Sequence, residues 1–143
     1  MSTVGLVVLI GVVVVATAAG LLRRRTTGRV RTARVAAGAA PALTEAELGQ
    51  PLGARATIVQ FSSAFCRPCV ATRHVLADAA SSVPGVAHVE VDAESNLELV
   101  RRLRVSSTPT TLLLDRSGVE RGRAGGVPRK PDVLAALAQL GGG

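Results

Sequence analysis

Hydrophobic residues are unevenly distributed along this chain, and their longest run lies at the N-terminus. Residues 4–22 (VGLVVLIGVVVVATAAGLL), which Val4 opens and Leu22 closes, contain no charged side chain. Their number matches the roughly 20 residues that a helix needs to cross the hydrocarbon core of a bilayer. Glycine and valine weaken a helix in water, but lipid forces the backbone to satisfy its own hydrogen bonds. The pattern predicts one transmembrane helix, with a buried core helix or an export signal as the alternatives.

The charges around this stretch predict its orientation. No Lys or Arg precedes it, whereas basic residues follow it at once: Arg23, Arg24, Arg25, Arg29, Arg31 and Arg34. Basic residues beside a first helix tend to stay on the cytoplasmic side. We therefore expect a single-pass protein of the cell membrane whose main domain lies in the cytoplasm. Residues 16–18 (ATA) offer a small-x-small cleavage site, but the basic segment that precedes a secretory core is missing, so we expect the helix to be retained.

The next segment is polar and short of periodic hydrophobic residues. Residues 23–41 consist largely of Arg, Thr, Ala and Gly, which predicts a basic juxtamembrane linker with at most a short strand around residues 30–35. Thr44 and Glu47 have the spacing of a helix capping box, and Gly49 should end that short helix. The expected organisation is an anchor over 1–22, a linker over 23–41 and one domain over 42–143.

Within that domain, β-branched runs alternate with helical segments. Strands are predicted at residues 56–61 (ATIVQF), 86–91 (VAHVEV) and 110–115 (TTLLLD), with an edge strand at 119–124 after a turn at 116–118. Helices are predicted at 66–80 and 95–102, and a last helix should hold Pro131 and Asp132 in its first turn and end at residues 141–143. The inward side chains expected of the first two helices are Ala71, Val75, Leu76 and Ala79, and Leu97, Val100 and Leu103.

The order of these elements indicates the fold class. A β-α-β-α-β-β-α succession implies parallel strands joined by right-handed crossovers, closed by an antiparallel hairpin. The prediction is an α/β domain with a central mixed sheet and helices on both faces.

The net charge of +7 comes almost wholly from the region beside the anchor. Residues 1–40 hold six Arg and no acid, whereas residues 41–143 hold ten Arg and one Lys against ten Asp and Glu. Attraction of juxtamembrane arginines to anionic lipid, about 1 kcal/mol each, accounts for the basic cluster. Phe61 and Phe65 are the only aromatic residues, so bases would find no stacking platform. Nucleic acid is not an expected partner.

Cys66 and Cys69 are the only cysteines, in a C-x-x-C pair. The spacing alone is compatible with half a zinc site, a structural disulfide, a redox pair or chance. Zinc normally takes four ligands, and His74 and His88 do not form a recognisable second pair, so no metal is expected.

The position of the pair favours redox chemistry. Cys66 stands where a buried strand is followed by a helix, and unpaired N–H groups at a helix N-terminus stabilise a thiolate. A thiolate is the form that attacks a disulfide. Cys69, one turn further along, is placed to resolve a mixed disulfide, and Pro68 suits the first turn.

A proline downstream adds a second feature. Pro109 follows Thr108 directly before the predicted strand at 110–115, which makes the Thr108–Pro109 bond a candidate cis peptide. An ordinary trans proline at the start of a strand is the alternative.

Together these features resemble the thioredoxin family over about residues 43–140. The resemblance is carried by FCRPC after a buried strand, VDAE at the end of the next, STPT leading into TLLLD, Gly125-Gly126 and the terminal helix. It implies a thioredoxin fold and a thiol–disulfide oxidoreductase with a redox-active Cys66–Cys69 disulfide and no other cofactor. In that family the first cysteine is the exposed nucleophile and the second resolves. The cis-proline faces the cysteines and presents backbone groups to the substrate.

The same resemblance implies the partners. These are protein or small-molecule disulfides, together with an external reductase or thiol donor, because the chain has no flavin or nicotinamide site. By resemblance, the residues facing the substrate are Phe65, Arg67, Pro68, Thr108 and Pro109.

Departures from the family pattern lie at the motif and beneath it. Phe65 stands where tryptophan is usual, and Arg67 where glycine is usual. Gln60 replaces the buried acid that is credited with deprotonating the resolving cysteine, and His88 stands in place of that acid's lysine partner. Gln60 cannot take a proton, so turnover should be slow unless His88 substitutes. Alternatives are an extracytoplasmic disulfide-handling protein, or a non-enzymatic thioredoxin-fold module that binds a metal or a partner.

Overall fold

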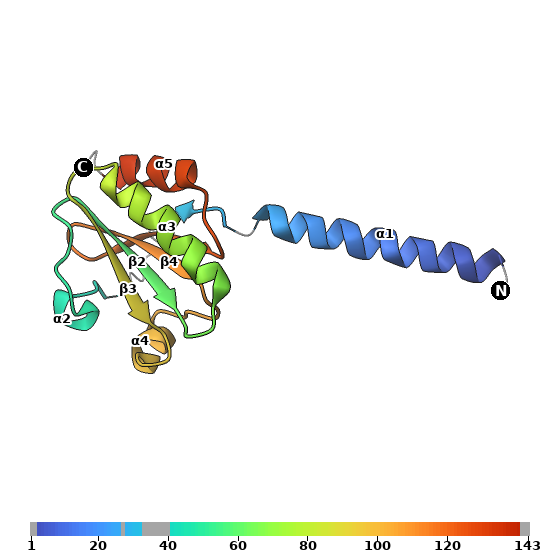
Figure 1. Cartoon of the computed structure of the whole chain (residues 1–143), viewed down its shortest axis with the longest axis horizontal. Coiled ribbons are helices and arrows are strands. Elements are labelled where there is room, and N and C mark those ends of the chain that lie inside the picture. The colour runs from blue at the N-terminus through green and yellow to red at the C-terminus, as the bar shows by residue number, and fades with distance from the viewer. Residues whose placement is uncertain (1–2, 27, 33–40, 141–143) are drawn as a thin grey trace.

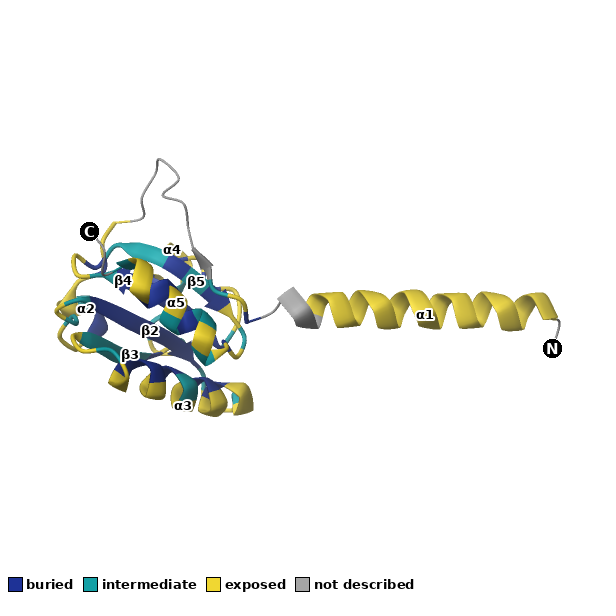
Figure 2. Ribbon diagram, turned by 90° about the horizontal axis from the view of Figure 1, so that it is seen from above, coloured by how far each residue is buried: buried dark blue, intermediate teal, exposed yellow. Residues whose placement is uncertain are grey.

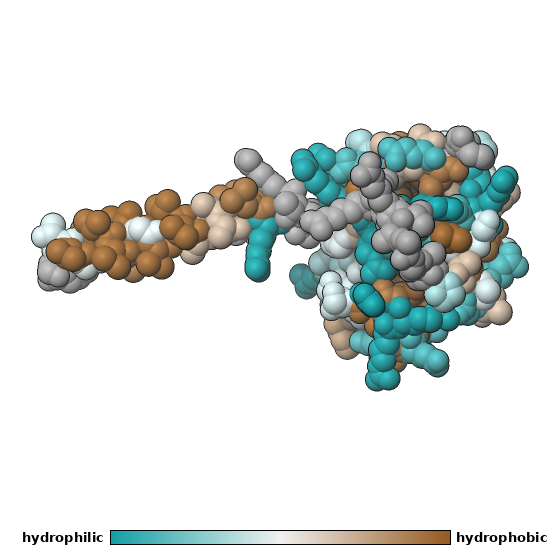
Figure 3. Space-filling model, turned by 180° about the vertical axis from the view of Figure 1, so that it is seen from behind, coloured by the Kyte–Doolittle hydropathy of each residue, from teal (hydrophilic) through white to brown (hydrophobic). Residues whose placement is uncertain are grey.

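The computed structural model describes residues 3–26, 28–32 and 41–140 of the chain. Its N-terminal helix, α1 (Thr3–Thr26), stands apart from an α/β domain (Figure 1). The segment Thr3–Arg23 is long and apolar enough to cross a membrane, and none of it is buried against the domain. Its surface is almost continuously hydrophobic (Figure 3). A core helix would bury such a surface, so the core-helix alternative is wrong; a membrane span and a signal sequence both fit.

Five strands form one mixed sheet, as the sequence predicts. They are β1 (Arg31–Thr32), β2 (Ala56–Ser62), β3 (Val86–Asp92), β4 (Thr110–Asp115) and β5 (Glu120–Gly125). Their order in the sheet is β1-β5-β4-β2-β3, with only β2 and β3 parallel. The central strand β2 is buried along its whole length, which explains why its sequence is nearly continuous in apolar and β-branched residues.

The expectation that β5 is an edge strand is wrong. β1 pairs with it antiparallel, with Arg31 opposite Arg123 and Thr32 opposite Gly122. The sequence suggested a short strand in this region, but a two-residue strand has no hydrophobic pattern that could indicate its pairing with β5. Residues 33–35 of the strand suggested around 30–35 lie outside the described residues.

Helices cover both faces of the sheet (Figure 2). On one face, α3 (Arg67–Ser81) and α5 (Lys130–Leu140) enclose a core that includes Ile58, Leu76 and Leu137. On the other, α2 (Glu45–Leu48) and α4 (Leu97–Arg102) contribute to a second core around Val59 and Phe61. Because alternate residues of β2 point to opposite faces, one strand serves both cores.

The inward face of α3 differs from the expected one. Leu76 and Ala79 are buried and Val75 is half-buried, but Ala71 is exposed. Thr72 is buried instead, because its hydroxyl donates to the Pro68 carbonyl at 2.9 Å and so needs no water. The helix thereby turns Cys69, Thr72 and Leu76 toward the sheet.

α4 also shows one wrong expectation. The helix begins at Leu97 instead of residue 95, since the Ser95 hydroxyl and the Asn96 amide bind Asp92 in the preceding turn. Leu97 is 54% exposed, and Leu99 is buried in its place, one helical turn before Leu103.

The predicted capping box before α2 is confirmed. The Glu47 carboxylate accepts from the Thr44 N–H at 2.9 Å, the Thr44 hydroxyl accepts from the Glu47 N–H, and Gly49 ends the helix in the left-handed conformation. An ion pair with Arg102 joins this helix to α4. The short helix α2 is therefore stabilised by its cap, by this ion pair and by the burial of Leu48 in the core.

Candidate active site

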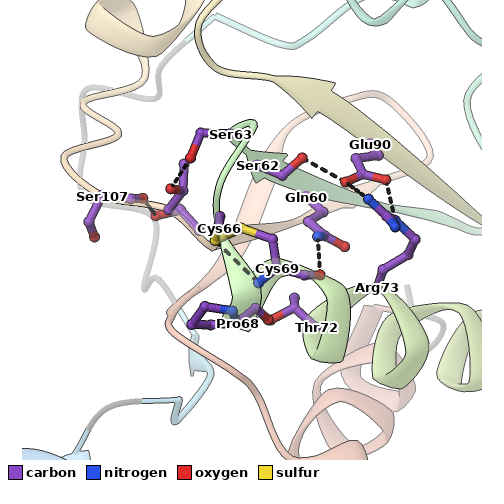
Figure 4. The surroundings of a disulfide bond; sticks show 12 residues. Gln60, Ser62, Ser63, Cys66, Pro68, Cys69, Thr72, Arg73, Glu90 and Ser107 are labelled. Carbon is purple, nitrogen blue, oxygen red and sulfur yellow. Dashed lines mark hydrogen bonds and ion pairs between the residues drawn. A yellow bond between two sulfur atoms is a disulfide. The ribbon is translucent and has the colours of Figure 1, made fainter.

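The C-x-x-C pair lies at the start of α3, just after the turn that follows β2. Cys66 is the N-cap of the helix, and its N–H donates to the Ser63 carbonyl at 3.3 Å. Its sulfur accepts from the Cys69 N–H at 3.2 Å (Figure 4). The first N–H groups of a helix have no intrahelical partner, so they favour negative charge on this sulfur. The N-terminal position expected for Cys66 is confirmed.

The two cysteines form a disulfide and differ sharply in exposure. Their Cα atoms are 5.3 Å apart. Cys66 is half-buried, whereas Cys69 is 2% exposed. A thiol or disulfide arriving from solvent therefore meets the Cys66 side of the bond first.

The motif residues beside Cys66 face outward. Phe65 is 100% exposed, and Arg67 and Pro68 are exposed as well. A fully exposed phenylalanine makes little contribution to the domain's own core. These three side chains are therefore accessible from solvent.

The Thr108–Pro109 peptide bond is cis, as the sequence predicts. The Thr108 hydroxyl is hydrogen-bonded to that of Ser63 at 2.8 Å, which joins the segment before Pro109 to the loop that carries Cys66. On the far side, the Gly126 N–H donates to the Pro109 carbonyl at 2.9 Å. Ser63 was not singled out from the sequence, because its role is visible only when the two loops come together.

A buried amide lies beneath the disulfide. The Gln60 side chain donates from Nε2 to the Cys69 carbonyl at 2.9 Å, and its Oε1 lies 3.2 Å from His88 Nε2. A carbonyl can only accept, so the amide NH₂ faces Cys69 and the amide oxygen faces His88. His88 Nε2 must then be the donor. The structure thus links His88 to Cys69 through Gln60.

Burial lowers the pKa of His88, because it disfavours the imidazolium form; nearby Arg73 acts in the same direction and Glu90 opposes it. His88 in its neutral form supplies the N–H that Gln60 accepts. Gln60 cannot take a proton itself, so proton transfer at this site would fall to His88, and that role stays a prediction.

A charged cluster next to this amide was missed by the sequence reasoning. Glu90 accepts two hydrogen bonds from the Arg73 guanidinium, at 2.6 and 2.7 Å, and one from the Ser62 hydroxyl at 2.6 Å (Figure 4). The hydrogen bond from Arg73 is the main reason that the pKa of Glu90 is lowered. The alternation in VAHVEV was an available signal, since it places His88 and Glu90 on one face of β3. The cluster ties α3 to the sheet one turn after Cys69.

No group of three or more His, Cys, Asp and Glu suited to a metal ion occurs within residues 3–26, 28–32 and 41–140. His74 is exposed on α3.

Comparisons with known proteins agree with this geometry. The model of the thioredoxin family matches residues 41–139. The thioredoxin of Mycoplasma pneumoniae is 30% identical over 82 residues, which cover 57% of this chain and 79% of that protein. A thioredoxin-like protein from Clostridium perfringens has a similar fold, with a TM-score of 0.55 and 24% identity over 66% of this chain and 77% of that one. Chloroplastic thioredoxin z has a TM-score of 0.56 and 23% identity, over 63% of this chain and 81% of that one.

Proposed function

This chain belongs to the thioredoxin family and is in general terms a thiol–disulfide oxidoreductase, and from that premise we propose that it exchanges disulfides with protein or small thiols while α1 tethers it to the cell membrane. Cys66 is the nucleophile and Cys69 the resolving residue. The domain works on the cytoplasmic side.

The difference between Cys66 and Cys69 in helix position and burial is the observation that supports this assignment of roles. Cys66 caps α3, where helix N–H groups favour a thiolate, and Cys69 is buried one turn further along. In the reduced protein, the Cys66 thiolate attacks one sulfur of a partner disulfide and releases the other as a thiolate. The Cys69 thiolate then attacks the Cys66 sulfur, re-forms the Cys66–Cys69 disulfide and releases the second partner thiol. Two electrons pass to the partner, and an external dithiol donor restores them.

Trapping experiments test the order of attack. The Cys69→Ser variant should accumulate a mixed disulfide with insulin chains, because Cys66 can attack but nothing resolves the product. The matched Cys66→Ser variant should accumulate none, and the unmodified chain should reduce insulin with dithiothreitol as donor. Equal trapping by the two variants would contradict the assignment, and an inactive unmodified chain would favour a binding module.

The membrane tether is supported by the character of α1. Its apolar surface is exposed throughout, and in its middle the Thr17 hydroxyl donates to the Val13 carbonyl at 2.7 Å. Lipid would require such an internal partner for a hydroxyl. Arginines at one end alone favour the cytoplasmic side for the domain.

Labelling in intact cells tests the sidedness. A membrane-impermeant maleimide should reach reduced Cys66 only after the cells are made permeable. A Thr3→Cys variant that lacks Cys66 and Cys69 is the matched control and should be labelled in intact cells. The reverse pattern would establish the extracytoplasmic alternative, and a chain that is soluble after cell breakage would point to a cleaved signal.

A further inference from the structure

α1 joins the domain at the same end of the sheet that carries the disulfide. The register sets Phe61 of β2 opposite Thr110 and Thr110 opposite Gly125, so these residues share the end at which β2 leads to Cys66. Gly28 donates its N–H to the Gly125 carbonyl at 2.7 Å. In Figure 1 the N-terminal end of α3 and the domain-proximal end of α1 lie on the same side of the domain.

The connection between α1 and the domain is packed into the domain at Gly28. Gly28 is buried with φ near +88°, and a Cβ atom there would lie 2.4 Å from the Val127 carbonyl oxygen. Only glycine fits a backbone this close with a positive φ. β1 then continues the attachment by pairing with β5. The chain between α1 and β1 therefore does not act as a long loose tether.

This attachment limits how far the disulfide can rise above a membrane. The candidate span ends at Arg23, and the chain from there to Gly28 reaches at most about 18 Å, at no more than ~3.6 Å per residue. The sheet then separates β1 from β2 by about 15 Å, at ~4.8 Å between neighbouring strands. A free linker over residues 23–41 would instead reach about 65 Å when extended. This upper limit on the height of the disulfide follows from the length of the chain between Arg23 and Gly28 and not from the direction of α1.

We propose that the exchange partner is an integral membrane protein whose reactive cysteines lie close to the bilayer surface, on the same side as this domain. This inference rests on the proposed function and narrows its substrate class. The exchange is the one described above, in which reduced Cys66 and Cys69 become a disulfide and the partner disulfide becomes two thiols. Two proteins held in one membrane at matching heights meet at a high effective concentration, whereas a disulfide far above the surface gains nothing from the tether.

Two peptide probes test the proposal with the full-length chain in vesicles of phosphatidylcholine and phosphatidylglycerol. Each probe is a single-span peptide that carries a disulfide-linked fluorescent thiol. In the low probe the disulfide follows the span directly, and in the high probe a helical spacer of about 40 residues raises it by ~60 Å. The protein is reduced beforehand, and release of the fluorescent thiol is followed over a single turnover. The low probe should react at least tenfold faster than the high probe.

A matched variant isolates the effect of the attachment. A flexible Gly/Ser segment of about 40 residues, inserted after Thr26, leaves the seat of Gly28 intact but lets the whole domain rise. It should lower the ratio of the two rates at least threefold, while both proteins reduce a small soluble aromatic disulfide at the same rate. Equal rates on the two probes with the unmodified chain would overturn the proposal. Failure to float with the vesicles, or to reduce the soluble disulfide, would instead overturn the proposed function on which it rests.

Discussion

Replacement of Gln60 by leucine isolates the contribution of the buried amide. Gln60 is fully buried, and it bridges the Cys69 carbonyl and His88 Nε2. Leucine has a similar size but neither donates nor accepts, so both bonds are lost without a large cavity.

The expected loss of stability follows from what each former partner can do next. The Cys69 carbonyl belongs to α3 and keeps a place in the helical ladder, so its loss is that of one hydrogen bond. His88 is half-buried and can turn toward water. Two bonds at about 0.5–1.5 kcal/mol each, offset by the apolar burial that leucine gains, give a net loss of about 1–2 kcal/mol. For a domain of this size that lowers Tm by about 5–10 °C.

Thermal unfolding of the detergent-solubilised chain measures this loss. Far-ultraviolet circular dichroism is the suitable signal, since the chain has no Trp or Tyr. Gln139→Leu is the matched control, because Gln139 is exposed on α5 and surface substitutions usually stay within about 0.5 kcal/mol. A double-mutant cycle with His88→Leu should show a coupling of at least about 0.5 kcal/mol. A Tm for Gln60→Leu at or above that of the unmodified chain would contradict this expectation, because the amide's hydrogen bonds would then only balance the cost of burying it.

Three further predictions concern charge, pH and capping. Arg67→Gly should lower the reduction potential by a few tens of millivolts at most, because an exposed pair of Arg67 and the Cys66 thiolate contributes about 1 kcal/mol and ~1.4 kcal/mol corresponds to ~30 mV for two electrons. Equilibration in glutathione buffers, read by thiol alkylation, measures the potential. An unchanged potential would mean that Arg67 points away from Cys66. Burial lowers the pKa of His88 in the folded chain, so its contribution to stability is present above the unfolded value of about 6.5 and is lost as the pH falls toward the lowered value. Urea midpoints at pH 7.5 and 5.5 should therefore differ less in His88→Asn than in the unmodified chain, whereas a pH dependence that moves with the exposed His74→Asn control instead would contradict the assignment. Thr44→Ala should lower the free energy of unfolding by about 1 kcal/mol through loss of the α2 cap, and urea denaturation of Ser106→Ala, an exposed loop control, should show no comparable change.

Much of the fold could be predicted because local and tertiary preferences agree. The buried strand β2, the helix that begins at the C-x-x-C pair and the cis bond before β4 each have a local signal in residue type and order. The expectation that Ala71 and Leu97 point into the core is wrong, because it rests on hydrophobicity alone. A threonine whose hydroxyl bonds within its own helix can be buried, and a turn that binds Asp92 can delay the start of a helix.

The candidate site was predicted in its parts but not in its connections. The motif indicated Cys66 and Cys69, and the resemblance to the thioredoxin family indicated Gln60 and His88. The bond between Ser63 and Thr108 joins residues 45 positions apart, and the pairing of β1 with β5 joins segments that share no pattern. Contacts of this kind depend on how loops and edges meet in three dimensions, which periodicity does not encode.

The two faces of the sheet contribute differently to the free energy of unfolding and to the redox chemistry of the disulfide. The face toward α2 and α4 is lined mainly by apolar side chains such as Val59, Phe61, Val89 and Leu112, whose burial supplies hydrophobic stabilisation. The face toward α3 is apolar at Ile58 but becomes polar toward the disulfide, where the side chains of Gln60, Ser62, His88 and Glu90 are bonded to one another, to α3 or to Cys69. Substitutions on the first face should therefore change the free energy of unfolding and leave the reduction potential nearly constant. Substitutions in the polar part of the second face should change both, because those side chains hold the turn that carries Cys69.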